Sequence, residues 1–114
     1  RRRAVIGFGL VYQTPAETVV QVPNELRTIV ERVPLAEFDR ASLFQFGPSS
    51  LDFELIFHVD SADMEEFAQV RQSVMLAMLR RFAELDVQFA YPTQTTFTAA
   101  PDGTLVMPYA TAKD

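Results

Sequence analysis

Cysteine and tryptophan are absent from the chain, and histidine occurs once, as His58. Without cysteine, the chain cannot form disulfides, thiolate zinc sites or iron–sulfur clusters, and it has no thiol nucleophile. A single imidazole also excludes the usual histidine-rich metal sites and a pair of catalytic histidines. The longest continuous apolar run, from Val74 to Leu79, falls far short of the roughly 20 residues that a membrane-spanning helix needs.

Positive charge is scarce as well. Ten basic side chains stand against 15 acidic ones, which gives the 114 residues a formal net charge of −5. Three of the bases are Arg1, Arg2 and Arg3, so the rest of the chain is more acidic still. Nucleic-acid phosphate binds to clustered Lys and Arg, so we expect no nucleic-acid partner. Apolar residues make up 48% of the sequence, and its ten Phe are expected to dominate the core of one domain.

Apolar periodicity and turn residues predict six elements in the order strand, helix, strand, strand, helix, strand: residues 4–12, 15–32, 37–46, 51–59, 62–86 and 87–91. Thr14 and Ser61 are expected to cap the two helices. Pro23 interrupts the first helical pattern, which predicts either a kink or a second helix that begins there. The first residue is not Met and no secretory signal is recognisable, so we expect the chain to be part of a longer protein.

The two central strands are expected to form a hairpin with residues 47–50 as its loop. The predicted register pairs Phe46 with Leu51, Phe44 with Phe53, Leu43 with Glu54 and Asp39 with His58. The side chains that face the helices form the predicted core: Ile6, Phe8, Leu10, Phe44, Phe46, Phe53, Leu55, Phe57, Phe67, Val74, Met78, Phe82 and Phe89.

The order of the elements predicts an α+β fold, a ferredoxin-like βαββαβ two-layer sandwich. Its four-stranded antiparallel sheet carries both helices on one face. We assign residues 1–98 to this domain and residues 99–114 to a polar C-terminal tail, with a short extra strand expected at 104–107.

The candidate chemical groups have simpler structural explanations. His58 lies near Asp39 in the predicted register, but acid–base and metal sites need more convergent partners. Asp52 and Glu54 share one strand face, where alternating acids usually form the solvated side. We therefore expect no catalysis, no metal and no cofactor.

The face of the sheet opposite the helices is the candidate subunit interface, because it combines apolar residues with two glycines. The candidate interface residues are Val5, Gly7, Gly9, Val11, Leu43 and Ile56. Three acids on the same face, Asp39, Asp52 and Glu54, oppose a large dry contact.

Three segments carry a family resemblance: residues 9–15 (GLVYQTP), 46–55 (FGPSSLDFEL) and 89–95 (FAYPTQT). Together with Arg80-Arg81-Phe82, they resemble the C-terminal cytoplasmic domain of the small-conductance mechanosensitive channel family over about residues 1–98. The middle segment is the most specific. The third departs from the family's usual ending, P-F-P-Q-x-T, because it keeps Pro92 and shifts the rest, as in a divergent bacterial branch.

The resemblance implies a cytoplasmic vestibule and assembly domain of a bacterial mechanosensitive ion channel, with no chemistry of its own. It implies a parent protein in the inner membrane, with transmembrane helices and a β domain upstream in the same chain. It also implies that copies assemble into a ring around a cytoplasmic chamber. Two alternatives remain: a stand-alone ferredoxin-like regulatory domain that binds a small ligand at a subunit interface, and an enzyme of the dimeric ferredoxin-like type.

Overall fold

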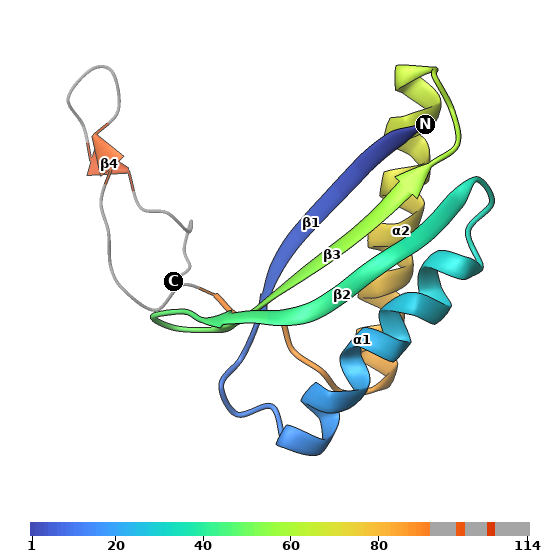
Figure 1. The fold of residues 1–114 in the computed structure, drawn as a ribbon. Helices are drawn as coiled ribbons and strands as arrows, with labels where there is room; N and C mark the ends of the chain where they lie inside the picture. The colour runs from blue at the N-terminus through green and yellow to red at the C-terminus, as the bar shows by residue number, and fades with distance from the viewer. Residues whose placement is uncertain (92–97, 100–104, 107–114) are drawn as a thin grey trace.

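The computed structural model describes residues 1–91 and two short strands at 98–99 and 105–106. The elements are, in chain order, β1 (Arg2–Leu10), α1 (Ala16–Glu31), β2 (Ala36–Phe46), β3 (Leu51–Val59), α2 (Met64–Glu84), β4 (Thr98–Ala99) and β5 (Leu105–Val106) (Figure 1).

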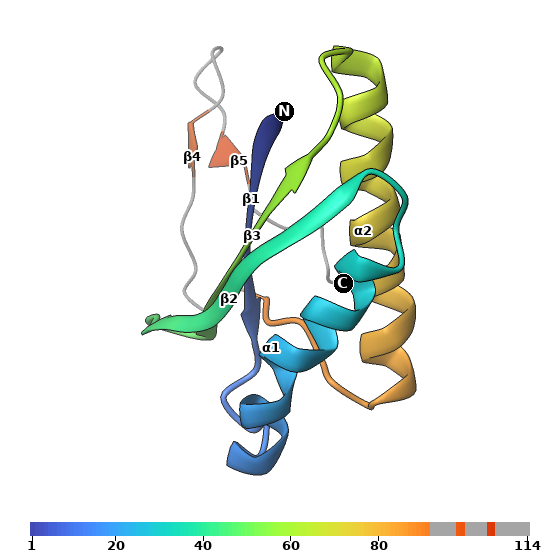
Figure 2. The same cartoon turned by 45° about the vertical axis from the view of Figure 1, so that its right-hand side comes forward.

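Strands β1, β3 and β2 form one antiparallel sheet in that spatial order, so β3 is the central strand. Both helices cover the same face of this sheet, and Figure 2 shows the two layers side by side. The predicted α+β class and the placement of both helices on one face are confirmed.

The prediction of a fourth strand in this sheet is wrong for the described residues. After α2 the chain touches β1 through one isolated bridge, between Leu10 and Phe89, with flanking hydrogen bonds from Val11 N to Gln88 O (3.1 Å) and from Ala90 N to Gly9 O (2.9 Å). The next donor in this antiparallel pattern belongs to residue 92, and Pro92 has no backbone N–H. The pairing is therefore too short to make a strand. The described residues lack the last strand of the predicted βαββαβ order.

In the C-terminal tail, β4 and β5 pair with each other as a separate two-stranded sheet, with Thr98 opposite Val106. The extra strand expected at 104–107 thus corresponds to β5. The other residues of the predicted tail lie outside the described part of the chain.

Both helices form where expected, with different caps. Helix α1 runs through Pro23 without a break, and Thr14 donates its hydroxyl to Val11 O (2.6 Å) instead of capping, so the N-cap residue is Pro15. Helix α2 is capped by the carboxylate of Asp63, which accepts from Glu65 N (3.1 Å), while Ser61 binds Asp63 N (3.0 Å). Asp therefore replaces the predicted Ser as the cap.

The hairpin register is correct only beside the loop, where Phe46 pairs with Leu51. Irregularities between Leu43 and Gln45 and between Phe38 and Arg40 each add one residue to β2, as a β-bulge does. Beyond the first irregularity, Leu43 pairs with Phe53 instead of Glu54. Beyond the second, Glu37 instead of Asp39 lies opposite His58.

The core lies between the sheet and the helices and is centred on aromatic rings. Phe8 stacks on Phe53 at 5.4 Å between ring centroids and contacts Phe82 and Phe89, each at 5.8 Å. All the predicted core residues except Phe44 and Phe46 belong to this core or pack against it. Phe44 and Phe46 are 60% and 75% exposed, because they lie at the hairpin end of β2.

A two-point salt bridge joins the helices on their outer side. The guanidinium of Arg81 in α2 donates from Nε to Glu25 Oε1 (2.8 Å) and from Nη2 to Glu25 Oε2 (3.2 Å). These hydrogen bonds lower the pKa of the Glu25 carboxyl below its ordinary value. The carboxylate therefore stabilises the folded state above the pKa that it has in the unfolded chain.

This coupling predicts a pH-dependent stability difference. Because the folded-state pKa of Glu25 is depressed, its contribution is full at neutral pH and is lost as the pH falls below about 4.5. We expect Glu25→Gln to lower the free energy of unfolding at pH 7 and to have a progressively smaller effect in the acid range, measured by urea unfolding across pH. In an Arg81→Ala background, most of the effect is expected to disappear. An equal loss at all pH values would contradict the assignment.

Candidate functional site

Three of the predicted contact residues, Val5, Gly7 and Ile56, lie on the open face of the sheet. Val5 and Gly7 of β1 are exposed on it, as expected. Ile56 of β3 points to this face between Val5 and Arg40, its cross-strand neighbours, but is only 1% exposed. Ile56 therefore offers almost no surface to a partner while its neighbours stay in place.

Leu43 does not lie on this face. Its pairing with Phe53, whose side chain enters the core, places Leu43 on the helix side of β2, where it is partly exposed. The expectation that Leu43 belongs to the open face is wrong because the irregularity next to Phe44 shifts the register by one residue, and one residue reverses the face.

Gly9 and Val11 lie where β1 ends. A Cβ at Gly9 would approach Ser50 Cβ and Oγ to 2.9 Å, so the glycine lets the hairpin loop pack closely against β1. Val11 is half-buried and donates its N–H to Gln88 O at 3.1 Å. Both residues serve the packing at this end of the sheet.

Two of the three acids of the open face, Asp39 and Asp52, are engaged in local contacts. Asp39 Oδ2 lies 3.1 Å from His58 Nε2, so the two meet as expected although they are not opposite each other in the ladder. Asp52 accepts hydrogen bonds from the hydroxyl of Ser50 and from Gln45 Nε2 (3.1 Å), which together lower the pKa of its carboxyl. Within the described residues, no group of three or more His, Cys, Asp or Glu side chains is placed to hold a metal ion.

The hairpin loop is built around Asp52 and Gly47. Gly47 N donates to Ser50 O (2.7 Å), and the Tyr12 hydroxyl donates to Gly47 O. A Cβ at Gly47 would lie 2.6 Å from Asp52 Oδ2, which is closer than any ordinary contact. The segment 46–55 thus combines a tightly packed loop with the buried side chains of β3.

This close approach predicts the effect of adding one methyl group. Gly47→Ala is expected to displace the Asp52 carboxylate and to lower the free energy of unfolding by about 1–3 kcal/mol, measured by urea unfolding. Gly7→Ala is the matched control, since a Cβ there meets nothing nearer than Phe53 O at 4.0 Å. Equal effects of the two substitutions would show that packing at Gly47 is not limiting.

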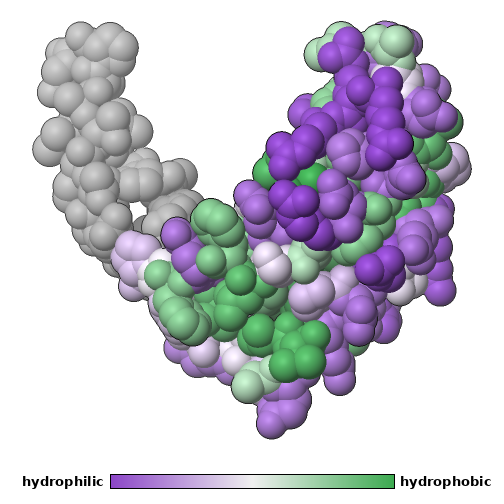
Figure 3. Space-filling view, viewed as in Figure 1, coloured by the Kyte–Doolittle hydropathy of each residue, from purple (hydrophilic) through white to green (hydrophobic). Residues whose placement is uncertain are grey.

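The apolar hairpin end, residues 43–51, forms a surface that is not among those predicted from the sequence. Figure 3 shows hydrophobic residues gathered over this end of the molecule, while hydrophilic residues cover the opposite end. Leu43, Phe44 and Phe46 are the exposed apolar residues of this part of β2. One feature of the sequence does indicate this surface. No residue from 43 to 51 is charged, which is unusual for a solvated hairpin tip.

A hollow of 410 Å³ lies between the helices. Arg81 and Glu25 line it, but they bind each other, and Arg81 also donates to Glu84 (3.0 Å). Arg32 and Arg80 also line it, so its charged lining combines the Arg81–Glu25–Glu84 cluster with two further guanidinium groups. Neither helix in the described part of the chain combines the length and apolar character needed to cross a bilayer.

Comparison with known proteins places this fold in a family. Residues 4–89 match the family described as "Mechanosensitive ion channel MscS, C-terminal". The chain is 25% identical over 99 residues to the small-conductance mechanosensitive channel MscMJ of Methanocaldococcus jannaschii, covering 85% of this chain and 28% of the relative. It is 22% identical over 100 residues to an uncharacterized MscS family protein of Aquifex aeolicus, covering 85% of this chain and 27% of the relative.

A third relative is the large-conductance mechanosensitive channel MscMJLR of the same archaeon, 21% identical over 100 residues, with 83% of this chain and 28% of the relative covered. The chain therefore spans little more than a quarter of the length of these proteins. The family match runs from β1 to Phe89 and so includes the three-stranded sheet, both helices and the hairpin loop. The chain belongs to the MscS family of mechanosensitive channels and corresponds to that family's C-terminal domain.

Proposed function

We propose that residues 1–98 form the cytoplasmic vestibule and assembly domain of a mechanosensitive channel of a bacterial inner membrane. The family match over residues 4–89 carries this proposal. The aligned segment covers only 28% and 27% of the first two relatives, which leaves room for a pore elsewhere in the same polypeptide. The domain then acts by holding copies of the channel together and supporting the pore.

A purely mechanical role fits the chemistry of the described residues. Asp52 anchors the hairpin loop, and Asp39 and His58 bind each other on the sheet surface. His58 also lines a hollow of 340 Å³ with Arg1, Glu37 and Asp60, where Arg1 binds Glu37 at 2.9 Å. This lining contains no Ser, Thr, Cys or Lys that could act as a nucleophile. We therefore infer that the domain performs no catalysis.

Assembly requires surfaces that a second copy can bury. Val5 and Gly7 on the open face and the apolar hairpin end are accessible for such contacts. In the complete channel, the membrane-embedded parts would raise the effective concentration at these contacts. Isolated domains are accordingly expected to associate weakly, as monomers or loose dimers at micromolar concentration.

The coding sequence upstream of Arg1 provides the test of this proposal. We expect an open reading frame that continues upstream and encodes apolar segments of about 20 residues, long enough to cross a bilayer. A start codon directly before Arg1, or an upstream region without such segments, would contradict the channel role.

A further inference from the structure

An apolar pocket lies beside the outer edge of β1, on the side of the sheet covered by α2. Its volume is 180 Å³, and its walls come from Ile6, Phe8, Met75, Met78, Leu79 and Phe89. No charged side chain lines it. Met75 and Leu79 of α2 are about half-exposed at its rim.

The pocket is open because the outer edge of β1 has few backbone hydrogen bonds to another strand. Within the described residues, β3 pairs with the inner edge of β1, and its outer edge has the single bridge from Leu10 to Phe89. In the described part of the chain, no strand pairs with the edge beside Ile6 and Phe8, and Met75 and Leu79 of α2 stay about half-exposed there.

The size of the pocket fits one aromatic ring. Apolar cavities of about 150 Å³ in protein cores bind benzene, and this pocket is slightly larger and open on one side. Flexible methionine side chains at its wall can adapt to an inserted ring and make favourable sulfur–aromatic contacts. An aromatic side chain without neighbouring charges is thus the ligand that suits the pocket.

The same chain presents such a side chain at the hairpin end. Phe46 is 75% exposed and Phe44 is 60% exposed, and no residue from 43 to 51 is charged. The hydrogen bonds of Tyr12 and Asp52 fix the loop that comes after these residues. The tip is therefore preorganised, which lowers the entropic cost of inserting it into a partner.

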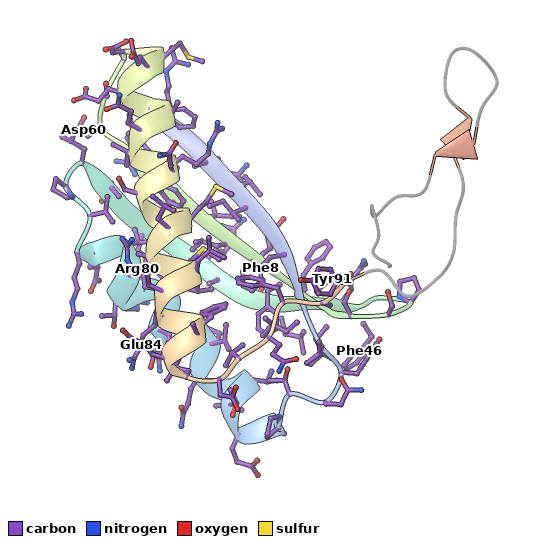
Figure 4. All side chains as sticks on the ribbon, turned by 180° about the vertical axis from the view of Figure 1, so that it is seen from behind. Phe8, Phe46, Asp60, Arg80, Glu84 and Tyr91 are labelled. Atoms are coloured by element: carbon purple, nitrogen blue, oxygen red, sulfur yellow. The ribbon has the colours of Figure 1, made fainter. Side chains whose placement is uncertain are left out.

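The tip cannot fill the pocket of its own chain. Phe46 belongs to β2 and the pocket adjoins β1, and these strands form opposite edges of the sheet. Figure 4 shows Phe8 beside α2, and Phe46 well away from it at the far end of the hairpin. A contact between tip and pocket must therefore join two copies.

We propose that the hairpin tip of one copy, with Phe46 as its anchor, inserts into the pocket between β1 and α2 of the next copy. This inference rests on the proposed assembly role and identifies the surfaces that serve it. Because the two surfaces differ and lie on opposite edges, the contact is heterologous, and repetition of such a contact closes a ring when the rotation allows.

Direct strand pairing between the two edges is less suitable. Two irregularities interrupt the regular ladder of β2, as bulges do at edges that avoid pairing. Arg1, Arg2 and Arg3 place positive charge at the start of the β1 edge. Insertion of the Phe46 side chain into the pocket does not require a regular hydrogen-bonding edge on either strand.

Site-directed cross-linking between two chains tests the contact, since the natural chain has no cysteine. One chain carries Ser49→Cys in the hairpin loop, and the other carries Gln72→Cys, one turn before Met75 on α2. The two are mixed at high concentration with a short bismaleimide, and the product that joins positions 49 and 72 is identified by peptide mass spectrometry. Each chain alone serves as the control for symmetric contacts.

Two further substitutions test the anchor and the pocket. Phe46→Ser in the first chain, or Leu79→Glu in the second, is expected to reduce the 49–72 product at least about fivefold, as loss of an interface anchor does. Val20→Ser is the control for the tip, because Val20 is 74% exposed on α1. Leu76→Glu is the control for the pocket, because Leu76 is partly exposed on α2 but does not line it. Both controls are expected to leave the yield nearly unchanged.

Each alternative result overturns the proposed contact. Absence of the 49–72 product, or a yield insensitive to Phe46→Ser, would exclude the hairpin tip as the occupant. A yield reduced by Leu79→Glu but not by Phe46→Ser would mean that the pocket receives another segment, such as one from residues 92–114. Native mass spectrometry of the complete polypeptide separates this contact from the proposed assembly role. If the cross-linking results exclude the contact but the complete polypeptide is oligomeric, only the proposed contact is wrong. A monomeric complete polypeptide would contradict the assembly role itself.

Discussion

Phe53→Ala is expected to lower the free energy of unfolding by about 3–5 kcal/mol. Phe53 lies on the central strand, is 2% exposed, and stacks on Phe8 at 5.4 Å. Removing its ring leaves a cavity that sheet and helices cannot close without moving against each other. Urea unfolding at micromolar concentration measures the loss.

Phe46→Ala is the matched control, since it removes the same ring from a site that is 75% exposed. Its expected effect on the free energy of unfolding is within about 0.5 kcal/mol. A loss below about 1 kcal/mol for Phe53→Ala would mean that Phe53 does not fill the core.

Ile56→Lys is expected to lower the free energy of unfolding by more than about 2 kcal/mol. Ile56 points away from the helices, but only 1% of its surface is exposed. The substitution removes a buried apolar side chain and introduces an ammonium group where solvent is excluded. Urea unfolding, with sedimentation velocity on the same samples, separates a loss of stability from a loss of association.

Val5→Lys provides the comparison, because Val5 pairs directly with Ile56 on the same face and is about half-exposed. Its expected effect on stability is below about 1 kcal/mol. If Ile56→Lys leaves stability unchanged, the side chain at 56 reaches solvent and this face is more open than its burial indicates.

The contrast between Ile56 and Leu43 explains how far sequence periodicity could predict the contact surface. Alternation along residues 51–59 correctly gives both faces of β3, because that strand is regular. The alternation of apolar and polar residues along β2 does not predict which face each side chain occupies. Each added residue, one near Phe44 and one near Asp39, reverses the face of the strand residues beyond it. Nothing in the local sequence marks either position, so periodicity alone places Leu43 on the wrong side.

The extent of the sheet is overestimated from sequence for a related reason. Residues 87–91 alternate as a strand does, but alternation does not reveal how many partners a segment finds. The chain leaves α2 through Asp86, which has a φ of 58°, and it reaches β1 only near Leu10. An antiparallel ladder continued past Ala90 would need its next backbone donor from residue 92, which is a proline and has no N–H. Among residues 1–91, no further strand extends along β1 beside the pocket at Phe8.

The segment 46–55 could be recognised from sequence, and the structure supplies physical reasons for its residues. Gly47 makes room for the Asp52 carboxylate, and Ser50 donates a hydrogen bond to it. Leu51 and Phe53 then enter the core on alternate positions. The loop therefore needs a small residue, a hydroxyl and a carboxylate at fixed spacing, and alternating apolar residues after them.

The number of suction-activated channels in membrane patches shows whether the domain supports a working channel. The complete polypeptide would be expressed in cells without other mechanosensitive channels and compared, at equal expression, with the same polypeptide lacking residues 4–91. We expect pressure-dependent openings from the complete polypeptide and far fewer active channels per patch without the domain. No pressure-dependent openings from the complete polypeptide, or an unchanged number of channels after the deletion, would contradict it.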